Sequence, residues 1–303
     1  MTTIKEKLTR RNFFKQTGKF VAGTAAVTTL SPLILTQVKG LSKTSSKSLV
    51  SASQVVRMQL DLERALAKPI EQRKWTMFID IQKCVGCNAC SVACMAENNL
   101  PPGVSYRKVF DSEFGDYPDV QRFFMPTNCM QCENAPCISA ANAVVADAMG
   151  RRQDGIVTIN YEKFHGRKVF EATKKACPYT ALYYDEGKYY TGGTPVIEQY
   201  EKRTVVEYGK EVNKGDTRGA GRKCHFCMHR IDAGILPACA TTCLGQAMYF
   251  GDANDPAALV TQKIKLQSNH IVKEKAGTHP RIPYTFGNAS PSKVKEVCTT
   301  CHE

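Results

Sequence analysis

Residues 77–94 read MFIDIQKCVGCNACSVAC, an apolar segment that runs directly into four cysteines. Residues 77–81 have the composition of a short strand, and the cysteines after them are spaced C-x2-C-x2-C-x3-C. This spacing lets a tight loop direct three thiolates at one 4Fe-4S cluster, while the fourth, on the helix that follows, points toward a second cluster. Neither cluster is complete with these residues alone, so we expect other cysteines to join them. The four are Cys84, Cys87, Cys90 and Cys94.

A second group of cysteines completes the pattern. Two cysteines lie in KCHFC, residues 223–227, and two more follow in PACATTC, residues 237–243. Pairing the two groups in crossed fashion, as two-cluster ferredoxins do, gives two full sets of four thiolates. A zinc ribbon is the alternative explanation for two C-x2-C pairs, but the third and fourth cysteines of each group are superfluous for zinc. The predicted sets are Cys84, Cys87, Cys90 and Cys243 for one cluster, and Cys94, Cys224, Cys227 and Cys239 for the other.

The composition supports a metal protein rather than a disulfide scaffold. The chain has 303 residues and fourteen cysteines, most of them at two- and three-residue gaps, which suit metal capture better than disulfide bridging. The formal net charge is +13, which is compatible with nucleic-acid binding or with balancing negative metal-thiolate clusters. No basic stripe interleaves with aromatic residues, so we expect no nucleic-acid partner.

The most specific stretch is CHFCMHRIDAG, residues 224–234, followed by PAC at 237–239 and FGD at 250–252. With these motifs the chain resembles the four-cluster ferredoxin subunits of dimethyl sulfoxide reductase, polysulfide reductase and formate-dependent nitrite reductase complexes. The likeness covers residues 75 to 285 and includes GTHPR, residues 277–281, as a closing segment. In that family two further cysteine rows lie between the outer groups.

The first inner row is CMQCENAPC, residues 129–137, with Ala141 in its fourth position. The second inner row keeps only Cys177. The resemblance implies that one inner cluster is held by the surviving cysteines and that the other is deleted whole. Random decay of the rows would leave orphan ligands, whereas each survivor has three partners, so we expect three 4Fe-4S clusters. The surviving set is Cys129, Cys132, Cys137 and Cys177; the stand-ins at missing positions are Phe164, Arg167 and Phe170, or Arg167, Phe170 and Thr173.

The predicted fold is α+β, with two bacterial ferredoxin-like modules related by a pseudo-twofold, one inserted in the other, plus extended tails. Apolar spacing over residues 55–66 predicts a lead helix that ends before Pro69, and residues after Asp252 are expected to wrap outward. Residues 193–221 are expected to be a charged insertion. The predicted divisions are a signal peptide (1–40), a spacer with the lead helix (41–74), a first module with two clusters (75–118 and 194–253), an inserted second module with one cluster (119–193), and a C-terminal extension (254–303).

The N-terminus predicts export. TRRNFFK, residues 9–15, matches the twin-arginine pattern position by position, and a mildly apolar run follows over residues 20–35. An uncleaved membrane anchor is the alternative, because only residues 38–40 offer a passable cleavage site. Twin-arginine export carries folded proteins, which suits clusters inserted in the cytoplasm. We therefore expect a periplasmic protein bound to the outer face of the membrane through partners.

The tail ends in CTTCH, residues 298–302, the C-x-x-C-H pattern by which a c-type haem is attached. Cys298 and Cys301 would form the thioethers, and His302 would ligate the iron. A local disulfide or a free reactive pair is the alternative. Export meets the condition that haem attachment takes place on the far side of the membrane, so we expect one haem c.

These patterns together predict an electron-transfer subunit without catalysis of its own. No nucleophile elbow, phosphate loop or paired-carboxylate pattern is present. The resemblance implies a polytopic quinone-interacting membrane subunit as one partner, and a multihaem cytochrome c or a molybdopterin catalytic subunit as the other. The haem motif favours cytochromes and a setting in sulfur-compound respiration, by analogy only. The alternative from another class is a zinc-stabilised exported interaction scaffold.

Overall fold

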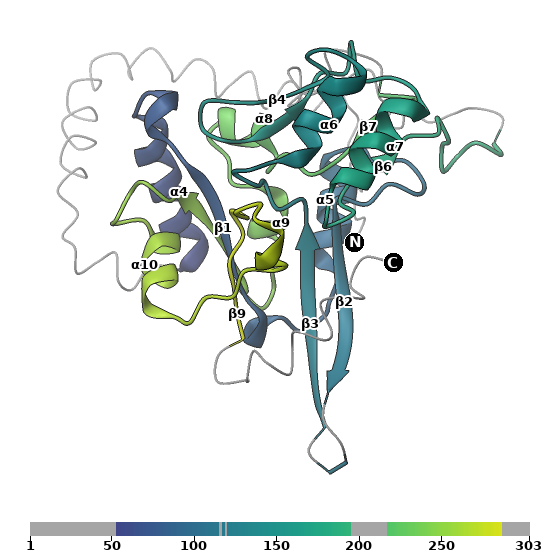
Figure 1. The fold of residues 1–303 in the computed structure, drawn as a ribbon. Helices are drawn as coiled ribbons and strands as arrows, with labels where there is room; N and C mark the ends of the chain where they lie inside the picture. Colours follow the sequence, from purple (N-terminus) through teal and green to yellow (C-terminus); the bar gives the residue numbers. More distant parts are fainter. Residues whose placement is uncertain (1–52, 115–116, 119, 195–216, 287–303) are drawn as a thin grey trace, which may run out of the picture. The chain divides into compact units, whose positions relative to one another are not determined.

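The computed structural model describes residues 53–114, 117–118, 120–194 and 217–286, which form a mixed helical and sheet structure (Figure 1). The α+β fold class is therefore confirmed. The helices are α4 (Gln54–Leu66), α5 (Ala89–Glu97), α6 (Pro136–Val144), α7 (Arg167–Ala176), α8 (Met228–Asp232), α9 (Ala238–Thr241) and α10 (Leu259–Leu266). The strands are β1 (Trp75–Asp80), β2 (Arg107–Phe114), β3 (Gln121–Asn128), β4 (Met149–Arg151), β5 (Val157–Ile159), β6 (Tyr183–Tyr184), β7 (Gly221–Arg222), β8 (Met248–Asp252) and β9 (Tyr284–Thr285).

Strand β1 is the centre of a three-stranded sheet in the order β8-β1-β9. All six of its residues are buried, four of them hydrophobic, as expected of a strand covered on both faces. Trp75 stacks on Phe250 of β8 with ring centroids 5.4 Å apart, and its indole nitrogen donates to the buried carboxylate of Asp154 at 2.8 Å. Helices α4 and α10 pack against this sheet (Figure 1). A packed hydrophobic core thus supports the loop that follows β1.

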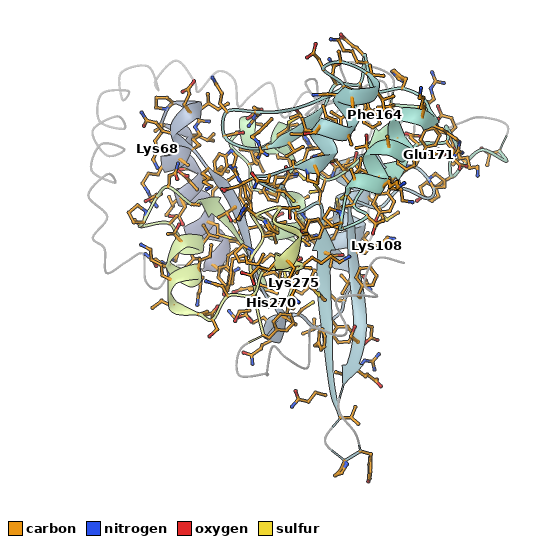
Figure 2. The ribbon with its side chains drawn as sticks, viewed as in Figure 1. Lys68, Lys108, Phe164, Glu171, His270 and Lys275 are labelled. Carbon is orange, nitrogen blue, oxygen red and sulfur yellow. The ribbon has the colours of Figure 1, made fainter. Side chains whose placement is uncertain are left out.

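Helix α4 occupies the segment where the apolar spacing predicts a lead helix. The side chain of Ser53 caps its first turn by accepting from the backbone N–H of Val56. Just beyond its C-terminal end, Lys68 pairs with the buried Asp252 of β8 at 2.8 Å (Figure 2). The lead helix is therefore tied directly to the central sheet.

The expectation that residues after Asp252 wrap outward is wrong for the end of the described residues. Strand β9 pairs in parallel with β1, and Tyr284 within it is completely buried. Just before β9, the backbone N–H of Glu133 donates to the carbonyl of His279 at 2.9 Å. The reason is that β1 has a second hydrogen-bonding edge, which β9 fills. This segment belongs to the core and contacts the inner cysteine row.

Strands β2 and β3 form a hairpin in which Arg107 pairs with Asn128 at the base. Because side chains alternate along a strand, Arg107 points into the protein and the next residue, Lys108, is exposed. Two smaller two-stranded sheets, β4-β5 and β6-β7, accompany helices α6 and α7. The hairpin therefore brings Arg107 and Asn128 to the buried centre of the molecule.

The pseudo-twofold, the insertion of one module in the other and the module boundaries stay predictions. The predicted signal peptide, residues 195–216 of the expected charged insertion, and the C-x-x-C-H tail lie outside the described residues. Within the described ranges, no helix combines the length and the apolarity needed to cross a membrane.

Candidate metal centres

Twelve cysteines lie within the described residues, all of them free thiols, and they line three cavities with four cysteines in each. The grouping coincides with the three ligand sets that the sequence predicts. Residues distant in sequence meet in each cavity; Cys177 faces the same space as Cys129. We call them the first set (Cys84, Cys87, Cys90 and Cys243), the second set (Cys94, Cys224, Cys227 and Cys239) and the third set (Cys129, Cys132, Cys137 and Cys177).

The first set is built on the loop between β1 and α5. Gly86 has φ +68° and Asn88 has φ 57°, a left-handed conformation that turns the chain sharply around the thiols. A Cβ on Gly86 would lie 2.5 Å from the ring of Phe124, so the loop also needs the absence of a side chain there. Cys90 and Cys94 both lie on α5, whereas the sequence pattern placed Cys90 in the loop. Cys94 is on the helix as expected, and it faces the second cavity.

Gly245 closes the first cavity, and we predict that Gly245→Ala disrupts it. An added Cβ would lie 2.1 Å from the carbonyl oxygen of Lys83, which is backbone and cannot rotate away. We expect a loss of about 1–3 kcal/mol in unfolding free energy together with weaker iron binding at the first set. Thermal unfolding and iron content measure the two effects. Gly150→Ala is the control, since its Cβ would meet nothing nearer than 3.9 Å; equal behaviour of the two variants would contradict the prediction.

Hydrogen-bond donors surround the sulfurs of the second set. The side-chain amide of Asn98 lies 3.5 Å from the Sγ of Cys94 and 3.8 Å from that of Cys227. The backbone N–H of Phe226 donates to the Sγ of Cys224 at 3.4 Å. Such bonds stabilise the charge of a thiolate and of any metal cluster that it ligates. The donors around the second set would therefore stabilise its cysteines as thiolates.

The third set lies beneath the closing segment of the chain. Cys129 and Cys132 precede α6, and Cys177 follows the last turn of α7. Tyr179 shares a 2.5 Å hydrogen bond with the hydroxyl of Thr278. Thr278 belongs to the motif GTHPR, so this motif packs against Tyr179, a residue that lines the third cavity.

The second set is linked to each of the other two. The side chain of Asn128 bonds the carbonyl of Cys129 at 3.1 Å and the Sγ of Cys224 at 3.5 Å, which links the second set to the third. Cys90 of the first set and Cys94 of the second lie on the same helix, α5, about one turn apart. The second cavity is thus adjacent to both of the others.

The cavities fit a group larger than a single ion. Within the described residues, no three His, Cys, Asp or Glu side chains come close enough to share one metal ion. Burial raises the pKa of Cys90 to about 11 and that of Cys132 to about 12. Near neutral pH these groups are protonated thiols, which must lose their protons when they ligate iron. Four soft sulfur donors around an enclosed space are the donor set of a 4Fe-4S cluster.

The positions where a fourth set would lie are filled by packed side chains. Phe164 and Phe170 are buried, and the Cβ of any residue larger than glycine at 221 would lie 2.7 Å from the ring of Phe164 (Figure 2). Phe170 also packs on Tyr184, with centroids 5.1 Å apart. Ala141 and Thr173 are completely buried, whereas Arg167 is largely exposed and pairs with Glu186. The rings of two phenylalanines therefore fill this region.

Sequence reasoning missed Arg107, Asn98, Asn128 and Gln131. Asn98 could have been found, because it lies four residues after Cys94 on the same side of a helix. Gln131 accepts from the N–H of Val157 at 2.8 Å and donates to the carbonyl of Cys224 at 2.6 Å, across elements far apart in sequence. No spacing rule reveals such contacts. His229, two residues after Cys227, shares a hydrogen bond of 3.0 Å with Glu97.

The chain is similar to iron-sulfur subunits of several reductases. Residues 120–192 and 199–253 match the family model described as 4Fe-4S dicluster domain. The B subunit of the selenate reductase from Mesobacillus selenatarsenatis is 46% identical over 233 residues, which cover 76% of this chain and 78% of that protein. The arsenate respiratory reductase iron-sulfur subunit of Shewanella sp. is 34% identical over 231 residues, 70% of this chain and 96% of that protein. The B component of the polysulfide reductase from Wolinella succinogenes is 30% identical over 213 residues, 69% and 93% respectively.

Proposed function

Because this protein belongs to the family of iron-sulfur subunits of the dimethyl sulfoxide, polysulfide, tetrathionate and nitrite reductases, we propose that it carries electrons along three 4Fe-4S clusters in a respiratory complex. It is an iron-sulfur electron-transfer subunit. Its own residues bind and order the redox centres, while the reaction with substrate takes place in a partner.

The observation that carries the proposal is the presence of three cavities, each lined by four cysteines. When bound, each 4Fe-4S cluster supplies reversible uptake of one electron. The chain's part is to hold the thiolates, to exclude water and to donate hydrogen bonds to sulfur. Asn128 links the second and third sets, and helix α5, which carries Cys90 and Cys94, links the first and second.

The proposed number of clusters is three. The packing of Phe164 and Phe170 against Gly221 supports it, because these rings occupy the region where the family's remaining ligand row would lie. In the resembling complexes that position holds the cluster nearest the membrane partner. The third set is therefore the last centre within the described residues on that side.

We also propose one haem c, attached to Cys298 and Cys301 with His302 as iron ligand, on the strength of the C-x-x-C-H sequence. The twin-arginine motif supports a periplasmic location, where attachment of such a haem takes place. With one cluster fewer than its four-cluster relatives, the chain would use the haem as an extra centre toward a cytochrome partner.

The proposed partners are a polytopic quinone-interacting membrane subunit and either a multihaem cytochrome c or a molybdopterin catalytic subunit. The similar proteins are named for reductases of selenate, arsenate and polysulfide. We infer that the complex reduces or oxidises a compound of sulfur or of a chemically related element. The alternative without redox function is a zinc-stabilised interaction scaffold.

One analysis of the purified full chain tests the function. We expect about twelve iron atoms in clusters, about one further iron atom in the haem, about twelve acid-labile sulfide atoms per chain, and no zinc. Cys301→Ser serves as the haem control, since it is expected to remove the c-type haem spectrum and to leave the iron-sulfur content unchanged. A colourless protein that contains zinc in place of iron would overturn the proposal.

A further inference from the structure

Arg107 is a buried cation whose hydrogen-bonding capacity is not used within the described residues. The residue is 2% exposed. Its Nη2 lies 3.1 Å from the Sδ of Met77 and 3.4 Å from the Sγ of Cys239. Its other donors, Nε and Nη1, have no acceptor within the described part of the chain. A guanidinium taken out of water without an anionic partner is unfavourable, so this position calls for a negative charge nearby.

Within the described residues, the other buried cations, Arg222 and Lys223, donate to oxygen atoms. Arg222 lies 3.2 Å from the carboxylate of Asp185 and donates to the hydroxyl of Tyr106 at 3.0 Å. Lys223 donates to the backbone carbonyls of Val157 and Cys224. Arg107 differs because, among the residues that the structure describes, its guanidinium donates only to sulfur atoms. The thiolates of a loaded cluster are the anions that fit this place.

Arg107 faces the second set. It lines the second cavity together with Cys94 and Cys239. It is not among the residues that line the first and third cavities.

Resting on the function proposed above, we propose that Arg107 is a fixed positive charge beside the second set that raises the reduction potential of the cluster bound there. A reduced cluster carries one more negative charge than the oxidised one, so a buried cation stabilises the reduced form. The effect is strong because little water screens the charge and the Sγ of Cys239 is only 3.4 Å away. Arg107 acts on the cluster through its charge and is therefore a positioning residue.

The test is a redox titration of Arg107→Gln and Arg107→Lys, followed by electron paramagnetic resonance, with iron and sulfide measured on the same samples. For Arg107→Gln we expect the midpoint potential of the second cluster to become more negative, by more than that of either other cluster. Arg107→Lys keeps the charge and is expected to stay near the parent value. Lys108→Gln is the matched control (Figure 2): it removes one charge from the next residue, which is exposed, and is expected to leave the potential of the second cluster unchanged.

Loaded Arg107→Gln with unchanged potentials would overturn the proposal, and so would Arg107→Lys shifting as far as Arg107→Gln. If Arg107→Gln fails to load the second set while Arg107→Lys loads it, the cation is required for cluster binding rather than for the potential, and the proposal falls. If both variants fail to bind the cluster, the shape of the arginine side chain rather than its charge is required, and the proposal falls. Absence of clusters from the parent protein would instead refute the proposed function.

Discussion

Cys177→Ala is expected to lower the iron content by about four of the about twelve cluster iron atoms per chain, while the first and second sets stay loaded. Cys177 lines the third cavity and is separated by about forty residues of sequence from the other three thiols there. Three remaining thiols leave one iron without its protein ligand, which destabilises the whole cluster. Iron and sulfide analysis measures the loss, and electron paramagnetic resonance shows which signal disappears.

Thr173→Ala is the matched control for this variant. Thr173 is a fully buried residue of α7, the helix that Cys177 follows, and its hydroxyl donates to the carbonyl of Val169 at 2.6 Å. Its loss is expected to cost about 1 kcal/mol of stability and to leave the iron content unchanged. Full iron content in Cys177→Ala would show that Cys177 is not a ligand. Iron loss in Thr173→Ala would show that the assay reports helix packing rather than ligation.

The grouping of the cysteines could be predicted because ligand spacing is a local property with a chemical cause. A loop that turns around a cluster must bring thiols into reach at fixed intervals. The eight cysteines of the first and second sets could therefore be grouped from two short stretches of sequence. Strand β1 and helix α4 are likewise read from apolar pattern. The position of β9 could not be predicted in this way. Two residues carry too little periodicity to indicate a strand, and their parallel pairing with β1 depends on the whole fold.

The packing of the residues that stand at the family's cysteine positions also could not be predicted from local spacing. The sequence left two alternative registers for the stand-ins, one beginning at Phe164 and one ending at Thr173. In the structure Phe164, Phe170 and Thr173 are all buried, while Arg167, common to both registers, is exposed. Packing against Gly221 from a distant segment decides this arrangement. No rule of spacing within residues 164–176 could have supplied it.

Cys239 and Cys243 lie four residues apart, yet we predict that their loss affects different clusters. Cys239 lies on α9 and lines the second cavity, whereas Cys243 follows that helix and lines the first. Cys239→Ala should therefore remove the middle cluster, and Cys243→Ala the end one. Each variant is expected to lose about four iron atoms per chain, so iron content alone does not distinguish them.

Magnetic coupling between reduced neighbouring clusters separates the two variants. Cys243→Ala leaves the second and third sets adjacent, so the spin-coupled broadening in the electron paramagnetic resonance spectrum of the fully reduced protein should persist. Cys239→Ala leaves two clusters with no occupied site between them, and the broadening should be lost. Each variant serves as the control of the other, because their positions in sequence and their losses of iron are matched. Identical spectra would mean that both thiols ligate the same cluster, and the crossed arrangement of the first and second sets would be wrong.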